Sequence, residues 1–171
     1  MSGYNEETKR LNPKKRKELK EAVSHYQTAL SVFNLNQESF RKSGREEIRE
    51  DCLEKMYGGL ANAYFILGTN AYTLGTQLIE QAEANGPDNL NKTLVARGLK
   101  CWGKAIQNFV QVMGTQTTAE QNKISIGAIG HESVMKALKE DVYRTVREGV
   151  GLANMIGRPE LIDMYLKPTL K

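Results

Sequence analysis

The sequence predicts an all-α fold, an antiparallel bundle of four main helices followed by a short C-terminal helix. Apolar residues recur at intervals of three and four over long stretches, which is the period of an amphipathic helix. No stretch alternates apolar and polar residues between hairpin turns, so no strand is expected. The chain has 171 residues, 40% hydrophobic and 26% charged, and is therefore long enough to bury one core without disulfides or metals.

The first helix is predicted to begin at Asn12 and Pro13 and to end near Asn36. Asparagine is a good N-cap, and proline is tolerated at the first helical position because that position needs no backbone N–H. Residues 1–11 carry no periodicity and are predicted to form a flexible basic arm. Residues 12–171 are then expected to form a single helical domain.

The second helix is predicted to be unusually long, from the turn at Ser43 to the Asn-Gly-Pro sequence at 85–87. Ser43 and Glu46 have the spacing of a capping box. Four glycines lie in the helix interior, where each costs up to about 1 kcal/mol relative to alanine. They indicate either a close approach of another helix or a break, and a split of this helix near 68–70 is the main alternative.

The third helix is predicted over about 89–113, followed by a polar stretch over 114–130. The fourth is predicted over about 131–156, and a short final helix over 159–167. Six side chains on the apolar stripes are expected in the core: Leu60, Leu67, Trp102, Phe109, Leu138 and Leu152.

Residues that would carry catalysis or hold a metal are not found at the required spacings. Cys52 and Cys101 are far apart and lack a paired motif, so they are expected to be buried and inert. His25 and His131 have no second histidine at ligand spacing and are expected to be solvated or capping. Phosphate-binding glycine loops and nucleophile motifs are absent. The sequence therefore predicts a protein that is not an enzyme, with no cofactor, metal or small-molecule substrate.

Positive charge is concentrated near the N-terminus. Residues 9–20 carry seven cations and one carboxylate, a net charge of +6, which leaves −2 of the chain's +4 for the remainder. Cations in the first turn of a helix oppose its dipole, and such local inconsistency is typical of functional sites. The candidate nucleic-acid-binding residues are Lys9, Arg10, Lys14, Lys15, Arg16, Lys17 and Lys20, extended by Arg41, Lys42 and Arg45 if the first inter-helix turn lies near the arm.

These charges favour a non-catalytic binding subunit that contacts the backbone of RNA or DNA, as one copy in a larger nucleoprotein assembly. Phe40 is the only aromatic residue among the cations, so backbone contact is expected rather than base stacking. Self-association or other protein subunits are expected as further partners. The alternative function is a protein–protein adaptor or chaperone with a groove between helices. The arm by itself is also compatible with a solubilising tail, or with an acidic protein or lipid surface as its partner.

The expected location is the cytoplasm, or a virus particle assembled inside a cell. The N-terminus is charged where a signal peptide needs an apolar stretch. No uninterrupted apolar run reaches about 18 residues, so no membrane partner is expected.

Overall fold

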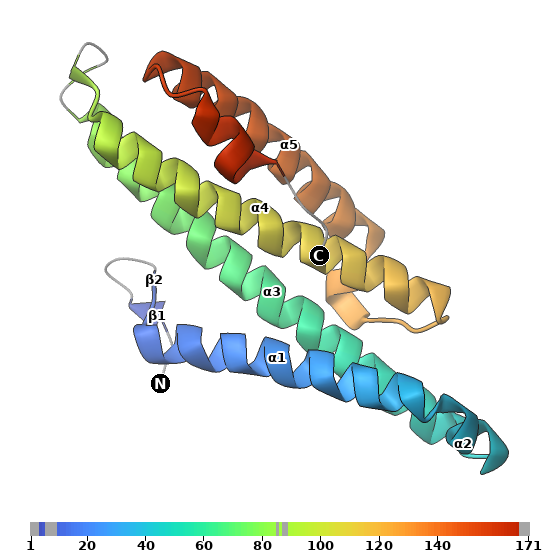
Figure 1. Ribbon diagram of the computed structural model, residues 1–171. Helices are drawn as coiled ribbons and strands as arrows, with labels where there is room; N and C mark the ends of the chain where they lie inside the picture. Colours follow the sequence, from blue (N-terminus) through green and yellow to red (C-terminus); the bar gives the residue numbers. More distant parts are fainter. Residues whose placement is uncertain (1–3, 6–9, 85, 87–88, 168–171) are drawn as a thin grey trace.

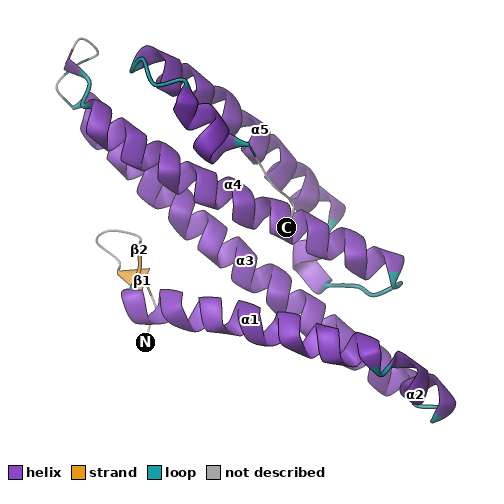
Figure 2. Ribbon diagram, in the orientation of Figure 1, coloured by secondary structure: helices purple, strands orange, loops and turns teal. Residues whose placement is uncertain are grey.

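The computed structural model describes residues 4–5, 10–84, 86 and 89–167, and this part of the chain consists of helices, short turns and loops, and one pair of two-residue strands (Figures 1 and 2). The four long helices are α1 (Pro13–Leu35), α3 (Glu46–Glu83), α4 (Lys92–Gln121) and α5 (Glu132–Met155). The shorter elements are β1 (Tyr4–Asn5), β2 (Arg10–Leu11), α2 (Gln37–Lys42), the 3-10 turn η2 (Gly127–Gly130) and the π-helical turn η3 (Ile162–Leu166). The predicted all-α class with four long helices is confirmed.

Helices α3 and α4 pack along most of their length and form the centre of the molecule (Figure 1). Helix α1 packs on α3, and α5 packs on α4 together with η3. Gly75 lies against Gly98, and Gly68 lies against Phe109, so α3 and α4 run in opposite directions. None of the described helices combines the length and the apolar character needed to cross a bilayer.

Helix α3 is one uninterrupted helix of 38 residues, so the alternative of a split near residues 68–70 is wrong. Gly68 and Gly75 lie where α4 comes closest, and Gly59 lies against the ring of Tyr26 in α1. A Cβ atom on Gly68 would lie 2.6 Å from the ring of Phe109, and one on Gly75 would lie 2.9 Å from the carbonyl oxygen of Gly98. Three of the four interior glycines therefore mark close contact with another helix, the first of the two interpretations that the sequence allowed.

Two helical glycines are expected to respond in opposite ways to alanine. Gly151, in α5, has no atom within 4 Å of its added Cβ, so Gly151→Ala should raise the free energy of unfolding by up to about 1 kcal/mol. Gly75→Ala should lower it by about 1–3 kcal/mol, because the new methyl group meets Trp102 and the backbone of α4. Urea unfolding of both variants measures the difference. If Gly75→Ala instead raised the free energy of unfolding, α3 and α4 would be able to move apart and accommodate the methyl group without loss of stability.

The start of α1 is as predicted. The side chain of Asn12 accepts a hydrogen bond from the backbone N–H of Lys15 at 2.7 Å, and Pro13 is the first helical residue. Leu11 is buried, and its N–H donates to Oδ1 of Asn70 at 2.8 Å. The C-terminal end of the predicted arm is thus attached to the middle of α3. Tyr4 and Asn5 of β1 pair antiparallel with β2, so these arm residues have a defined backbone. Flexibility of residues 1–3 and 6–9 stays a prediction, since they lie outside the described residues.

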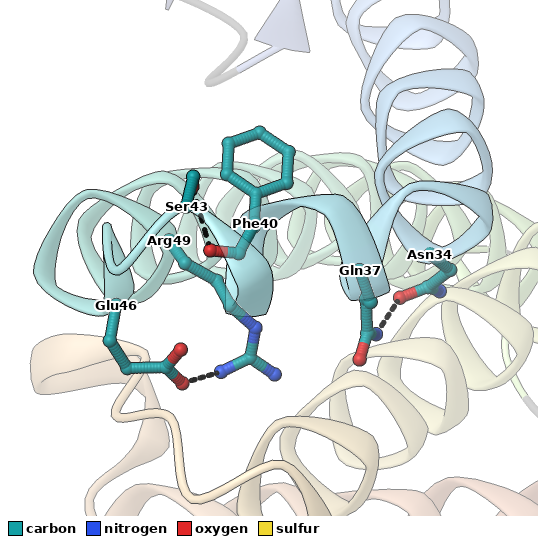
Figure 3. Close-up of polar contacts among 6 residues, drawn as sticks. All are labelled: Asn34, Gln37, Phe40, Ser43, Glu46 and Arg49. Atoms are coloured by element: carbon teal, nitrogen blue, oxygen red, sulfur yellow. Dashed lines mark hydrogen bonds and ion pairs between the residues drawn. The ribbon is translucent and has the colours of Figure 1, made fainter.

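The turn into α3 differs from the predicted capping box (Figure 3). The hydroxyl of Ser43 donates to the carbonyl oxygen of Phe40 at 2.8 Å and closes α2 instead of capping α3. The carboxylate of Glu46 accepts from the guanidinium of Arg49 at 2.6 Å. Helix α2 itself was not predicted. The ring of Phe40 stacks on Phe33 with 4.7 Å between centroids, a tertiary contact that holds this short helix against α1.

Helix α4 extends to Gln121, so the predicted end near residue 113 is wrong. Thr115 and Ala119 are buried, and the hydroxyl of Thr115 donates to the carbonyl oxygen of Gln111 at 2.8 Å. Contacts with the rest of the fold therefore keep a polar sequence helical. The predicted fourth helix and the short final helical segment are confirmed. Five of the six expected core residues are buried, and the sixth, Leu152, is half-buried at the edge of a cluster between α3, α4 and α5.

Candidate functional site

A groove of about 510 Å³ lies between α1 and α4, with α3 as its floor. It begins close to the N-terminal end of α1. Its lining residues are Arg16, Lys20 and Val23 from α1, Tyr64, Leu67, Asn70, Ala71 and Leu74 from α3, and Cys101, Lys104 and Asn108 from α4. Leu67 and Tyr64 are buried, whereas the three cations are exposed. The groove thus combines a largely apolar floor with charged walls.

The charges that line this groove all have the same sign. Arg16 and Lys20 stand on one wall and Lys104 stands on the other, and no aspartate or glutamate is among the lining residues. None of the three cations forms an ion pair with a carboxylate of the described residues. Cations of one sign along a cleft with low-dielectric walls concentrate anions from solution. The arrangement is therefore suited to binding phosphate or carboxylate groups.

The spacing of residues within each helix explains how the groove forms. Arg16, Lys20 and Val23 lie one turn apart on α1, and Cys101, Lys104 and Asn108 do so on α4, so each set shares one helix face. The floor is uncharged because α3 carries no Asp, Glu, Lys or Arg between Lys55 and Glu80.

Two polar side chains of α3 fix the floor in place. Asn70 is buried and accepts the hydrogen bond from Leu11, which holds the start of α1 beside the groove. The hydroxyl of Tyr64 accepts from Nε2 of Gln27 at 2.7 Å, which connects α3 to α1 further along. Burial raises the pKa of the Tyr64 hydroxyl, so it is protonated and neutral near pH 7. The groove therefore keeps its positive charge at that pH.

The predicted cations of the first helix are exposed, but they do not all face this groove. Lys15 lies 3.6 Å from Glu18 and Lys17 lies 3.7 Å from Glu21, both as exposed ion pairs. Such pairs contribute little to stability and leave the lysines accessible. Arg16 and Lys20 line the groove, and Lys14 is exposed in the first turn of the same helix.

The arm itself contains two of the predicted cations, Lys9 and Arg10. Lys9 lies outside the described residues. Arg10 belongs to β2, but the structure describes only its backbone.

The second predicted patch lies apart from the first. Arg41 and Lys42 belong to α2, and Arg45 precedes α3. Helix α1 has 23 residues, which at 1.5 Å per residue separates the two ends by about 35 Å. The first inter-helix turn is thus not near the arm, and the three residues do not extend the groove.

Lys104 was not among the residues predicted from the sequence. A signal for it exists, because residues 92–119 contain four cations and no carboxylate. Arg97 lies on the same face of α4, two turns before Lys104. The signal is weak without the fold, since four cations spread over nearly four turns resemble an ordinary exposed helix face. Only the approach of α1 brings Lys104 opposite Arg16 and Lys20.

The remaining candidates for chemistry stay separate from one another. His25 is exposed, and His131 caps α5 by accepting from the N–H of Ser133 at 3.3 Å, as expected for solvated and capping histidines. Cys52 and Cys101 are half-buried rather than fully buried, and they form no disulfide with each other. Within the described residues, no three side chains of His, Cys, Asp or Glu come together in a way that could hold a metal ion.

Comparison of the chain with models of protein families, with curated proteins and with solved structures found no match.

Proposed function

We propose that this protein is a non-catalytic binding subunit that holds the sugar–phosphate backbone of a nucleic acid in the groove between α1 and α4. The observation that carries the proposal is the convergence of Arg16, Lys20 and Lys104 from two helices on a groove whose lining has no carboxylate. Lys14 and Lys17 extend the positive surface outside the groove. Lysine and arginine contacts to phosphates supply most of the sequence-independent affinity of nucleic-acid-binding proteins.

The proposal includes a larger nucleoprotein assembly in which this chain is one copy. A groove with three cations binds only a few phosphates, and a short site of this kind binds weakly on its own. Repetition along a strand multiplies weak contacts through their effective concentration. We also take the four long helices as an antiparallel bundle that is open along this groove.

Salt dependence of binding by a single lysine variant tests the proposal. Lys104→Gln should make the slope of log affinity against log salt shallower by about 0.7–0.9, for mixed-sequence single strands or duplexes, since one released counterion is lost. Lys136→Gln is the matched control, because Lys136 is an exposed cation on α5 that does not line the groove. Filter binding between 50 and 300 mM salt measures both slopes. Failure of the wild-type protein to bind either probe at 50 mM salt would refute the proposal.

A protein–protein adaptor is the second candidate, and the apolar floor of the same groove favours it. Leu67, Ala71 and Leu74 lie one turn apart on α3, the spacing at which a groove accepts the apolar face of a partner helix. Binding through such anchors changes little with salt, whereas backbone binding weakens steeply. A partner protein that remains bound at 500 mM salt would therefore favour the adaptor.

A further inference from the structure

A second hollow of about 400 Å³ continues the groove toward the C-terminal end of α1. It lies between the same three helices. Its lining residues are Gln27, Leu30, Ser31 and Asn34 from α1, Tyr57 and Leu60 from α3, and Gln111, Gly114, Thr115 and Thr118 from α4. On every helix this set begins one turn after the first groove ends: Gln27 follows Val23, Leu60 precedes Tyr64, and Gln111 follows Asn108. The two hollows thus lie end to end as a trough along α3, and the hydrogen bond between Gln27 and Tyr64 lies where they meet.

The two ends of this trough differ in chemistry. The basic end, which is the groove already described, has three cations. The amide end, which is the second hollow, has no charged lining residue but seven side chains with an amide or a hydroxyl group: Gln27, Ser31, Asn34, Tyr57, Gln111, Thr115 and Thr118. Four of them already hydrogen-bond within the protein, Gln27 to Tyr64, Asn34 to Gln37, and the two threonines to carbonyl oxygens of α4, whereas the side chains of Ser31 and Gln111 form no such bond within the described residues. Cations bind phosphates without regard to sequence, whereas amides and hydroxyls can also hydrogen-bond to base edges and ribose 2′-hydroxyls, which differ between nucleotides.

We infer, on the basis of the proposed function, that the trough takes one single-stranded segment, with phosphates at the basic end and bases or sugars at the amide end. From Arg16 to Asn34 the trough follows α1 for 18 residues, or about 27 Å, which suits a site of about four nucleotides. The bases of a duplex are paired and stacked inside it, so a duplex would touch only the rim cations and leave the apolar floor and the amides uncontacted.

Stacking of bases on aromatic rings is not expected in the trough. The two aromatic side chains in the lining, Tyr57 and Tyr64, are both buried in the floor, with exposed fractions of 4% and 9%. Selection for single strands therefore rests on the shape of the trough and on its amide end. For this reason the inference predicts a dependence on base or sugar identity, which a purely cationic groove would lack.

The test compares four single-stranded probes with one duplex at 100 mM salt. The probes are 12-mers of dT, dA, rU and rA, and the duplex has 12 base pairs of mixed sequence. Wild-type protein should bind at least one single strand ten times more tightly than the duplex, and its affinities for the four single strands should differ at least fivefold.

The double variant Ser31→Ala with Gln111→Ala should reduce that fivefold difference to less than twofold and leave the salt slope unchanged. Within the described residues neither side chain hydrogen-bonds to another group, so the fold should be retained. Ser24→Ala with Gln107→Ala is the matched control, because it removes the same two groups from α1 and α4 outside the trough.

Each outcome separates this inference from the proposed function. A duplex bound as tightly as the best single strand overturns the inference and leaves backbone binding standing. Unchanged affinities for all four probes in the Ser31 and Gln111 variant also overturn it. In contrast, if the wild-type protein binds none of the five probes, the proposed function itself is refuted.

Discussion

Removal of all three groove cations, by Arg16→Gln, Lys20→Gln and Lys104→Gln together, should weaken the binding of a single strand about a hundredfold at 0.1 M salt. Three phosphate contacts contribute about 2 to the slope of log affinity against log salt for a single strand. This electrostatic contribution vanishes near 1 M salt, so its loss costs about two decades at 0.1 M. Glutamine keeps the helix propensity of lysine and arginine, so the variant should fold normally.

The control for this experiment has the same net charge. Lys136, Lys139 and Arg147 are exposed on α5, and none forms an ion pair with a described carboxylate. Their replacement by glutamine also lowers the net charge from +4 to +1. If the two triple variants lose the same affinity, overall charge rather than the groove accounts for binding. Fluorescence anisotropy at four salt concentrations distinguishes these results.

Leu99→Ala is expected to have the largest effect on stability, a loss of about 2–5 kcal/mol. Leu99 is fully buried in the cluster that joins α4 to α3 and α5, together with Trp102 and Ala153. Its side chain also packs close to Gly149 of α5, where an added Cβ would lie 3.4 Å from Cδ2 of Leu99. Truncation leaves a cavity that three packed helices cannot close.

Thermal unfolding measures this loss as a decrease in Tm of roughly 4–20 °C for a chain of this size. Leu35→Ala is the control, since Leu35 is 86% exposed and its truncation should change the free energy of unfolding by less than about 0.5 kcal/mol. Equal effects at both positions would mean that Leu99 does not lie in the core.

The all-α class and the places of the long helices were determined by local sequence. The apolar period predicts α1, α3 and α5, and Asn12 with Pro13 marks the start of α1, because caps and periodicity act within a few turns of one helix. The N-terminal cations were also visible in the sequence, since a cluster of seven in twelve residues needs no fold to be noticed.

Tertiary contacts decided what local sequence left open. The glycines of α3 allowed either a break or a close contact, and the approach of Trp102 and Phe109 made it a contact. The polar end of α4 stays helical because Ala119 is buried, and α2 forms because Phe40 meets Phe33.

The candidate site shows the same division. The sequence placed Arg16 and Lys20 in a basic segment but also grouped Arg41 with them, which the length of α1 excludes from the groove. Lys104 was not predicted from the sequence, because it is 84 residues from Lys20 in the chain. It lies across the groove from Lys20 only because α1 and α4 both pack along α3. Helix spacing is a local property, whereas the convergence of charges from two helices depends on long-range packing. The candidate site arises from this packing, so the sequence alone did not predict it in full.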